Sequence, residues 1–266
     1  MSTESISDTV SELQKNLEAV RQRIAEACRQ AGRRPESVTL VAVTKYAAPE
    51  QIRALIQLGV ADLAENYVQA LVQRAMQFGE FHARRAGAED AGVARELRWH
   101  MIGHLQRNKV RQLLPHVTML QTLDSLRLAE ELDQHCEKAG IRLPCLLQVN
   151  PSEEPQKSGV AVGAVTHLAE QIETMPNLRL MGLMCMAREG ADHDEARRTF
   201  ARCREVFEEM KHRRIGGDDV RHLSMGMTQD FEAGILEGAT IVRIGSAIFG
   251  ARPAGEGDGT NDDANG

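Results

Sequence analysis

Eight short apolar runs, each long enough for one buried strand, alternate with amphipathic segments along most of this 266-residue chain. Between the runs, apolar residues recur at three- and four-residue spacing, which is typical of helices. Strands that alternate with helices pair in parallel through right-handed crossovers. The runs are residues 38–43, 61–65, 98–103, 118–123, 144–149, 178–184, 220–224 and 240–245.

Eight strand–helix units predict the α/β class and a single closed (β/α)8 TIM barrel, a fold that typically needs about 250 residues. An open, doubly wound sheet is the alternative. That fold more often has a glycine-rich turn after its first strand, whereas residues 44–50 read TKYAAPE and the chain has no Gly-x-Gly-x-x-Gly motif. Leu13 and Leu17 share one helical face and Gly32 follows it, so residues 5–31 predict an extra N-terminal helix.

Composition predicts the domain boundaries. We expect the barrel to occupy residues 1–252. Residues 253–266 are acidic and nearly free of apolar side chains, which predicts a disordered tail. Residues 79–97 are polar and rich in alanine and glycine, which predicts an inserted loop or a ragged helix before the third strand.

Charge and cysteine content exclude several classes of protein. A net charge of -6 without a basic block argues against a nucleic-acid partner. No apolar run approaches the roughly 18 residues of a membrane span, and residues 1–14 lack the basic and apolar regions of a secretory signal. Five scattered cysteines without a Cys-x-x-Cys pair indicate reduced thiols and a cytoplasmic location.

A lysine follows the first apolar run, although lysine is rarely buried. In a (β/α)8 barrel the active face lies at the carboxyl ends of the strands, so Lys45 is expected at the barrel mouth. There it either extends its stem to the surface or offers its amine to a carbonyl ligand that forms a Schiff base. Apolar walls would favour the second role, because they lower the pKa of the amine and so favour its neutral, nucleophilic form.

Small residues follow the seventh and eighth strands, where this fold usually binds phosphate. Ser224 and Gly226 follow the seventh, and Gly245 and Ser246 follow the eighth. Glycine lets backbone N–H groups approach an anion, and a helix N-terminus adds partial positive charge. With Lys45, these loops predict a phosphorylated carbonyl ligand. Pyridoxal 5′-phosphate (PLP) and the substrate of a sugar-phosphate aldolase both fit this description.

Several longer motifs resemble those of the pyridoxal phosphate homeostasis protein family (YggS/PROSC). They span about residues 10–252 and include VAVTKY, ENYVQ, WHMIGHLQRNK, GLMCM, LSMGMTQDFEAGI and IVRIGSAIFG. The resemblance implies the barrel of the alanine-racemase N-terminal domain, covalently bound PLP, a monomer, and a role in vitamin B6 and amino-acid homeostasis. It also implies PLP-dependent apo-enzymes as candidate recipients of the cofactor.

The resemblance also implies roles for individual residues. Lys45 matches the lysine that forms the Schiff base, and Arg243 matches an arginine near the pyridine nitrogen. Asn66 matches a residue beside the cofactor. The residues that match the phosphate cradle are Ser224, Met225 (through its backbone), Gly245 and Ser246. The chain departs from the family pattern at Ala64, where glycine is usual, and in the length of residues 79–97.

Three functions remain open from the sequence: a PLP carrier without turnover, a PLP-dependent amino-acid racemase of low activity, and a cofactor-free aldolase. An arginine beside the pyridine nitrogen keeps that nitrogen unprotonated and weakens the ring as an electron sink, which disfavours transamination and decarboxylation but is tolerated by racemases. Two-base racemisation needs a second acid/base, and the sequence shows no added domain to supply it. His100 and His104 lack a companion carboxylate motif, so we expect no metal. These points favour the carrier, with no catalytic residues assigned.

Overall fold

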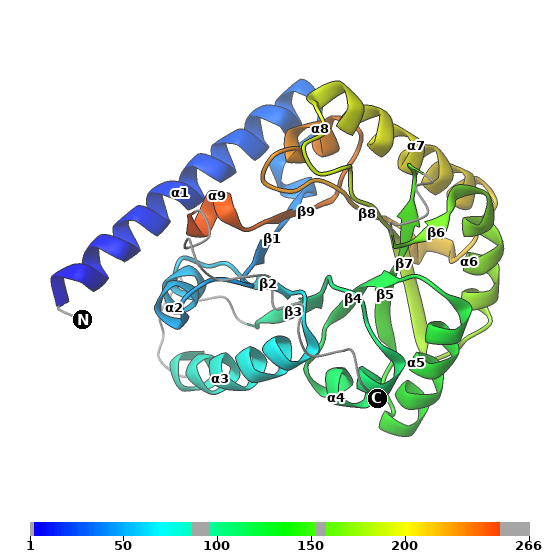
Figure 1. The fold of residues 1–266 in the computed structure, drawn as a ribbon, viewed down its shortest axis with the longest axis horizontal. Helices are drawn as coiled ribbons and strands as arrows, with labels where there is room; N and C mark the ends of the chain where they lie inside the picture. The colour runs from blue at the N-terminus through cyan, green and yellow to red at the C-terminus, as the bar shows by residue number, and fades with distance from the viewer. Residues whose placement is uncertain (1–2, 87–95, 153–157, 251–266) are drawn as a thin grey trace.

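The computed structural model describes residues 3–86, 96–152 and 158–250. Within them, parallel strands close into a barrel in the order β1-β2-β3-β4-β5-β7-β8-β9, and β9 pairs back with β1 (Figure 1). The barrel strands are β1 (Thr39–Val43), β2 (Asp62–Glu65), β3 (Arg98–Met101), β4 (Met119–Leu123), β5 (Leu143–Asn150), β7 (Leu178–Met184), β8 (His222–Ser224) and β9 (Ile241–Ile244). The (β/α)8 prediction is confirmed, and every predicted strand is present.

Helices surround the ring of strands (Figure 1). Local sequence sets where several begin and end: Pro49 occupies the first turn of α2, Ser125 and Asp192 accept hydrogen bonds from the first turns of α5 and α7, and Gly140 ends α5 with φ of 65°. The outer helices are α2 (Pro49–Gln57), α3 (Val68–Ala86), α4 (Val110–Leu113), α5 (Leu126–Ala139), α6 (Val165–Glu173), α7 (His193–His212), α8 (Phe231–Leu236) and α9 (Ser246–Phe249).

The N-terminal helix α1 (Thr3–Gln30) covers the seam between the first and last units of the barrel. It packs against α2, α8 and α9 (Figure 1). Its buried stripe has the helical spacing expected from the sequence and consists of Leu13, Leu17, Val20, Ile24 and Ala27. Because α9 has only 4 residues, α1 supplies the apolar cover that a full eighth helix would give.

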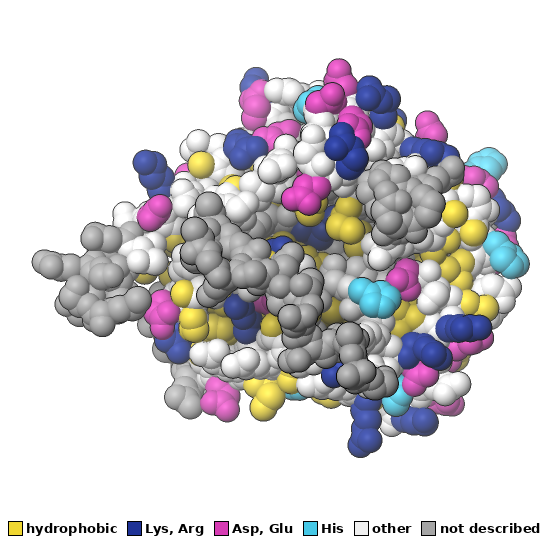
Figure 2. Space-filling model, viewed as in Figure 1, with side chains coloured by type: hydrophobic (Ala, Val, Ile, Leu, Met, Phe, Trp, Pro, Cys, Tyr) yellow, Lys and Arg dark blue, Asp and Glu magenta, His cyan; other side chains and the backbone are white. Residues whose placement is uncertain are grey.

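The strands bury residues on both faces, which is typical of a parallel barrel. One apolar cluster joins the outward residues of the strands, such as Leu63 and Val242, to the helices. A smaller cluster contains Val41, Ala64 and Ile241, which have the opposite parity on the same strands and therefore face the lumen. Charged side chains lie mainly around the edge of the molecule, with apolar atoms nearer the middle of the face in Figure 2.

Some elements differ from the expectation. A short strand, β6 (Val160–Ala161), pairs with the end of β5 and was not predicted. The first part of the 79–97 segment continues α3 as far as Ala86, and residues 87–95 lie outside the described part of the chain. The predicted tail also lies outside it.

In the part that the structure describes, no helix is long and apolar enough to span a membrane.

Candidate functional site

The predicted site residues come together at the carboxyl ends of neighbouring strands. β1 lies between β2 and β9, so the turn with Lys45 has the loop with Asn66 on one side and the loop with Gly245 on the other. A Cβ added to Gly245 would lie 3.2 Å from the carbonyl oxygen of Val43, two residues before Lys45. The last and first units therefore meet closely at this end.

Lys45 is exposed, and its Nζ lies 4.9 Å from the centre of the Tyr46 ring. One side chain of α3, that of Arg74, holds the turn that carries Lys45; we call this arrangement the Arg74 clamp. Arg74 donates to the carbonyls of Thr44 and Ala47, and its Nη1 lies 2.7 Å from Oε1 of Glu65. The position of Lys45 is thus fixed through its backbone, while its amine stays accessible.

Glu65 is fully buried at the end of β2. Burial raises the pKa of its carboxyl group, and Arg74 and Thr44 act in the opposite direction. Oε1 accepts from Arg74 and from the Thr44 hydroxyl, whereas Oε2 has no hydrogen-bond partner within the described residues. The ionised form of this carboxyl group is therefore stabilised mainly by Arg74.

The loop after β8 is compact. Met225 and Gly226 are buried, and Gly226 has φ of 95°, in the left-handed region that favours glycine. A Cβ there would lie 2.6 Å from Cα of Phe231. The carbonyl of Gly226 accepts from the backbone N–H of Arg243 at 3.0 Å, so this loop is tied to β9. Ser246, which starts α9, is exposed.

Asn66 is half-buried at the end of β2. A Cβ on Gly103 would lie 1.9 Å from the carbonyl oxygen of Asn66, so only glycine allows the loop after β3 to pack this closely against the end of β2. The Thr122 hydroxyl donates to the carbonyl of Gly103 at 2.7 Å. The ends of β2, β3 and β4 are therefore linked, and Asn66 lies in a fixed backbone.

Arg243 is the buried cation of the site, with 3% of its surface exposed. Nη1 donates to the Ser224 hydroxyl at 2.6 Å, and Nη2 donates to the carbonyl of Cys185 at 3.0 Å. No carboxylate within the described residues forms an ion pair with it. Burial lowers its pKa, but a guanidinium does not lose its proton in proteins. It has five N–H donors, and these two bonds leave three for a ligand.

Further polar side chains continue from Ser224 through the lumen. The Ser224 hydroxyl donates to Oε1 of Gln121 at 2.7 Å. Nε2 of Gln121 lies 3.0 Å from Nδ1 of His100, and Nε2 of His100 lies 3.1 Å from Oδ1 of Asp62. The interpretation of His100 as a hydrogen-bonded core residue is confirmed. Burial favours a raised pKa for Asp62, but hydrogen bonds from His100 and Arg98 lower it to about 2.

Sequence reasoning did not single out Asp62, Gln121 or Arg74. The first two could have been found from the two-residue period of a strand. Asp62 lies two residues before the lumen residue Ala64, and Gln121 lies two residues after Met119, so each pair shares the face that points into the lumen. A polar residue at a lumen position of an apolar strand is such a signal. Arg74 lies on a helix, where the sequence gives no indication that it reaches the turn of Lys45.

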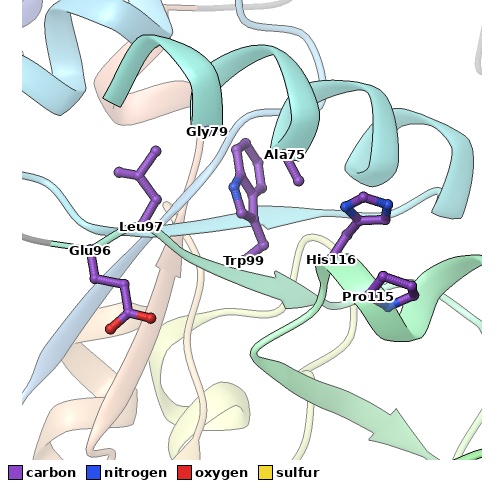
Figure 3. A pocket seen from close by; sticks show the side chains of 7 residues that line it. All are labelled: Ala75, Gly79, Glu96, Leu97, Trp99, Pro115 and His116. Atoms are coloured by element: carbon purple, nitrogen blue, oxygen red, sulfur yellow. The ribbon is translucent and has the colours of Figure 1, made fainter. Parts of the chain in front are cut away.

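The rim of the barrel at the Lys45 end also exposes apolar side chains. Four of the seven large hydrophobic residues exposed in the described part of the chain follow β1, β2, β7 and β8; they are Tyr46, Tyr67, Met186 and Met227. A hollow of about 260 Å³ lies elsewhere, between α3 and the segments that lead into β3 and β4 (Figure 3). It is lined by Trp99 and His116 among others, and none of the predicted site residues lines it.

Fold and rim together define a (β/α)8 barrel protein whose predicted site residues gather near the place where the first and last strands meet. A family model described as "Alanine racemase, N-terminal domain" matches residues 15–253. A relative from Pseudomonas aeruginosa, named "Pyridoxal phosphate homeostasis protein", is 37% identical over 246 residues, which cover 92% of this chain and 98% of the relative. The chain belongs to the pyridoxal phosphate homeostasis protein family, within the alanine-racemase N-terminal fold.

Solved structures agree with this assignment. A structure described as "an unknown protein from Bifidobacterium adolescentis" has a TM-score of 0.84 and 36% identity, and the match covers 91% of this chain and 96% of that one. PipY from Synechococcus elongatus, solved with PLP bound, has a TM-score of 0.70 and 29% identity, with 85% of this chain and 100% of that chain covered.

Proposed function

We propose that this protein binds PLP at the carboxyl end of the barrel, holds it as a Schiff base on Lys45, and serves vitamin B6 and amino-acid homeostasis without turnover. The names of its relatives and the PLP bound to PipY support the choice of ligand. The observation that carries the proposal is an accessible lysine on the turn after β1, next to β9 with its buried Arg243, which forms no ion pair with a carboxylate of the described residues.

The residues present fit the chemistry of the cofactor. PLP supplies an aldehyde, a phosphate and a pyridine ring. Lys45 provides the amine for the aldehyde, and Arg243 has donors left for the ring nitrogen. In this proposal the phosphate binds to the loops after β8 and β9, at Met225, Gly245 and Ser246.

Two of the proposed contacts have further constraints. The Ser224 hydroxyl already donates to Gln121 and accepts from Arg243, so its proposed phosphate contact would use its remaining lone pair or its backbone neighbours. Asn66 is proposed to lie beside the cofactor, at the position that its contact with Gly103 fixes.

Arg243 argues against transamination and decarboxylation, although amino-acid racemases tolerate an arginine at this place. A guanidinium donates to the pyridine nitrogen and leaves it unprotonated, which weakens the ring as an electron acceptor. Delivery to PLP-dependent apo-enzymes, a monomeric state and a cytoplasmic location stay predictions.

The test of binding is an absorbance spectrum of the purified protein with PLP, before and after borohydride reduction, followed by mass mapping of the labelled peptide. We expect a yellow protein whose reduced adduct lies on Lys45. Lys45→Ala should lose the adduct, and Lys138→Ala, which changes an exposed lysine at the end of α5, should keep it. A protein that stays colourless and unlabelled would contradict the proposal and favour the aldolase.

The test of turnover is loss of α-deuterium from labelled alanine or serine. The carrier proposal expects exchange no faster than that of free PLP. Washout at enzymatic rates that disappears in Lys45→Ala would replace the carrier by the racemase.

A further inference from the structure

A chain of hydrogen bonds crosses the barrel lumen behind the proposed cofactor site. It runs from Arg243 on β9 to Ser224 on β8, Gln121 on β4, His100 on β3 and Asp62 on β2, with distances of 2.6, 2.7, 3.0 and 3.1 Å. All five residues are at least 92% buried. β4 and β8 are not neighbours in the barrel, so the bond between Gln121 and Ser224 spans the lumen.

The two ends of the chain fix its direction. Arg243 can only donate, and ionised Asp62 can only accept. Ser224 accepts from Arg243 and donates to Oε1 of Gln121, so the amide nitrogen of Gln121 faces His100 and donates to Nδ1. His100 is then neutral, with its proton on Nε2, which donates to Asp62. Every member has a partner on each side.

This arrangement links the buried cation to the carboxylate of Asp62, which lies at the opposite end of the chain. Asp62 is itself held by two bonds from Arg98, at 2.6 and 2.7 Å. In a lumen of low dielectric constant, hydrogen bonds in one direction polarise and strengthen one another, and an unsatisfied member is costly. The Arg243 end therefore depends on Asp62, which is the first residue of β2 and lies away from the carboxyl ends of the strands.

We infer that His100 and Gln121 are positioning residues, which orient the Ser224 hydroxyl and through it the guanidinium of Arg243 that faces the ligand. The inference rests on the proposed function for the identity of that ligand. Without the amide of Gln121, the Ser224 hydroxyl rotates so that its proton reaches another acceptor. The oxygen lone pair that accepts from Nη1 of Arg243 then points in a different direction. Arg243 then keeps its charge and its bond to the carbonyl of Cys185, but it loses the second contact that fixes the direction of its guanidinium.

The central variant is Gln121→Met, which keeps the length of the side chain and removes both hydrogen bonds. Its matched control is Met119→Leu, which changes a lumen-facing residue of the same strand outside the chain. With PLP as the probe, we expect Gln121→Met to raise the dissociation constant about tenfold, as for a bond to a charged group, and to shift the absorbance and emission of the bound cofactor. Met119→Leu should leave both unchanged.

A double variant separates positioning from general destabilisation. His100→Phe breaks the chain at the next bond. If the chain acts as one unit, Gln121→Met with His100→Phe should shift the PLP spectrum no further than either single variant. Additive shifts, or an unchanged spectrum in Gln121→Met with full PLP occupancy, would overturn the inference.

A readout without the cofactor keeps the inference independent of the proposed function. In the apo-protein, ¹⁵N NMR should show His100 neutral with its proton on Nε2, and the Arg243 side chain should give slowly exchanging N–H signals that disappear in Gln121→Met. Where that variant does not fold, Gln121→Glu keeps the shape and the bond from Ser224 but lacks the donor to His100, and it should change the His100 signals. A different tautomer in the wild type would overturn the chain. Failure of the wild type to bind PLP, with these signals present, would contradict only the proposed function.

Discussion

Nη1 of Arg74 lies 2.7 Å from Oε1 of Glu65, and the same guanidinium binds the carbonyls of Thr44 and Ala47 on either side of Lys45. One side chain of α3 thus neutralises a fully buried carboxylate and holds the turn that carries the proposed amine. The barrel therefore couples its stability to the geometry of its site at this position.

Removing Arg74 should destabilise the protein. Arg74→Met leaves Glu65 buried without its cation, and loss of one partner of a buried pair costs about 3 kcal/mol. Urea unfolding measures this change. Arg53→Met is the control, because Arg53 and Glu50 are 4.0 Å apart with side chains that are partly exposed, and its loss should cost less than about 1 kcal/mol. Equal effects of the two substitutions would argue against the clamp.

Acid should weaken the fold partly through Asp62. Its pKa is lowered from 3.8 to about 2 in the folded protein, so its contribution is fully present above about pH 4 and disappears as pH falls towards 2. The free energy of unfolding of Asp62→Asn should therefore vary less between pH 5 and 2 than that of the wild type. Asp194→Asn, at an exposed position, should follow the wild type, and a parallel curve for Asp62→Asn would disprove this assignment.

Gly103 should not tolerate a side chain. Gly103→Ala places a Cβ 1.9 Å from the carbonyl oxygen of Asn66, and such overpacking costs about 1–3 kcal/mol. The melting temperature reports the loss, and PLP binding reports any movement of Asn66. Gly163→Ala is the matched control, since a Cβ there meets nothing within 4 Å. A wild-type melting temperature for Gly103→Ala would mean that the two loops move apart easily.

The native protein should react slowly with thiol reagents. All five cysteines are free and buried, and burial raises the pKa of Cys136 to about 11 and that of Cys145 to about 12. A chromogenic disulfide reagent at pH 8 should modify fewer than one thiol promptly in the folded protein. Five should react after denaturation. Prompt reaction of a native thiol would identify a segment that opens locally.

The sequence was sufficient to predict the order and type of most barrel elements, because each barrel strand is an apolar run of its own and the longer helices have their own periodicity. It was not sufficient for α9, whose 4 residues are too few for a periodic pattern, or for β6, whose two residues pair only because β5 is long. Both depend on neighbours in space.

The site was predictable in part for the same reason. Lys45, Arg243 and the glycine-containing loops lie in motifs of several residues and could be recognised locally. The lumen chain could not, because its central bond joins Gln121 and Ser224, which are 103 residues apart in the sequence. Polar residues at lumen positions indicate that a network exists, but only the closed barrel determines which of them meet.

The seam covered by α1 also has a consequence for the order of biosynthesis. This helix leaves the ribosome before the strands of the barrel, yet α8 and α9, two of the helices against which it packs, come from residues 231–249. β1 likewise lacks one of its two neighbouring strands until β9 has been translated. α2 can cover part of the apolar stripe of α1 early, but the part that packs against α8 and α9 stays exposed until those helices have been translated, which favours the binding of a chaperone to this helix on the nascent chain.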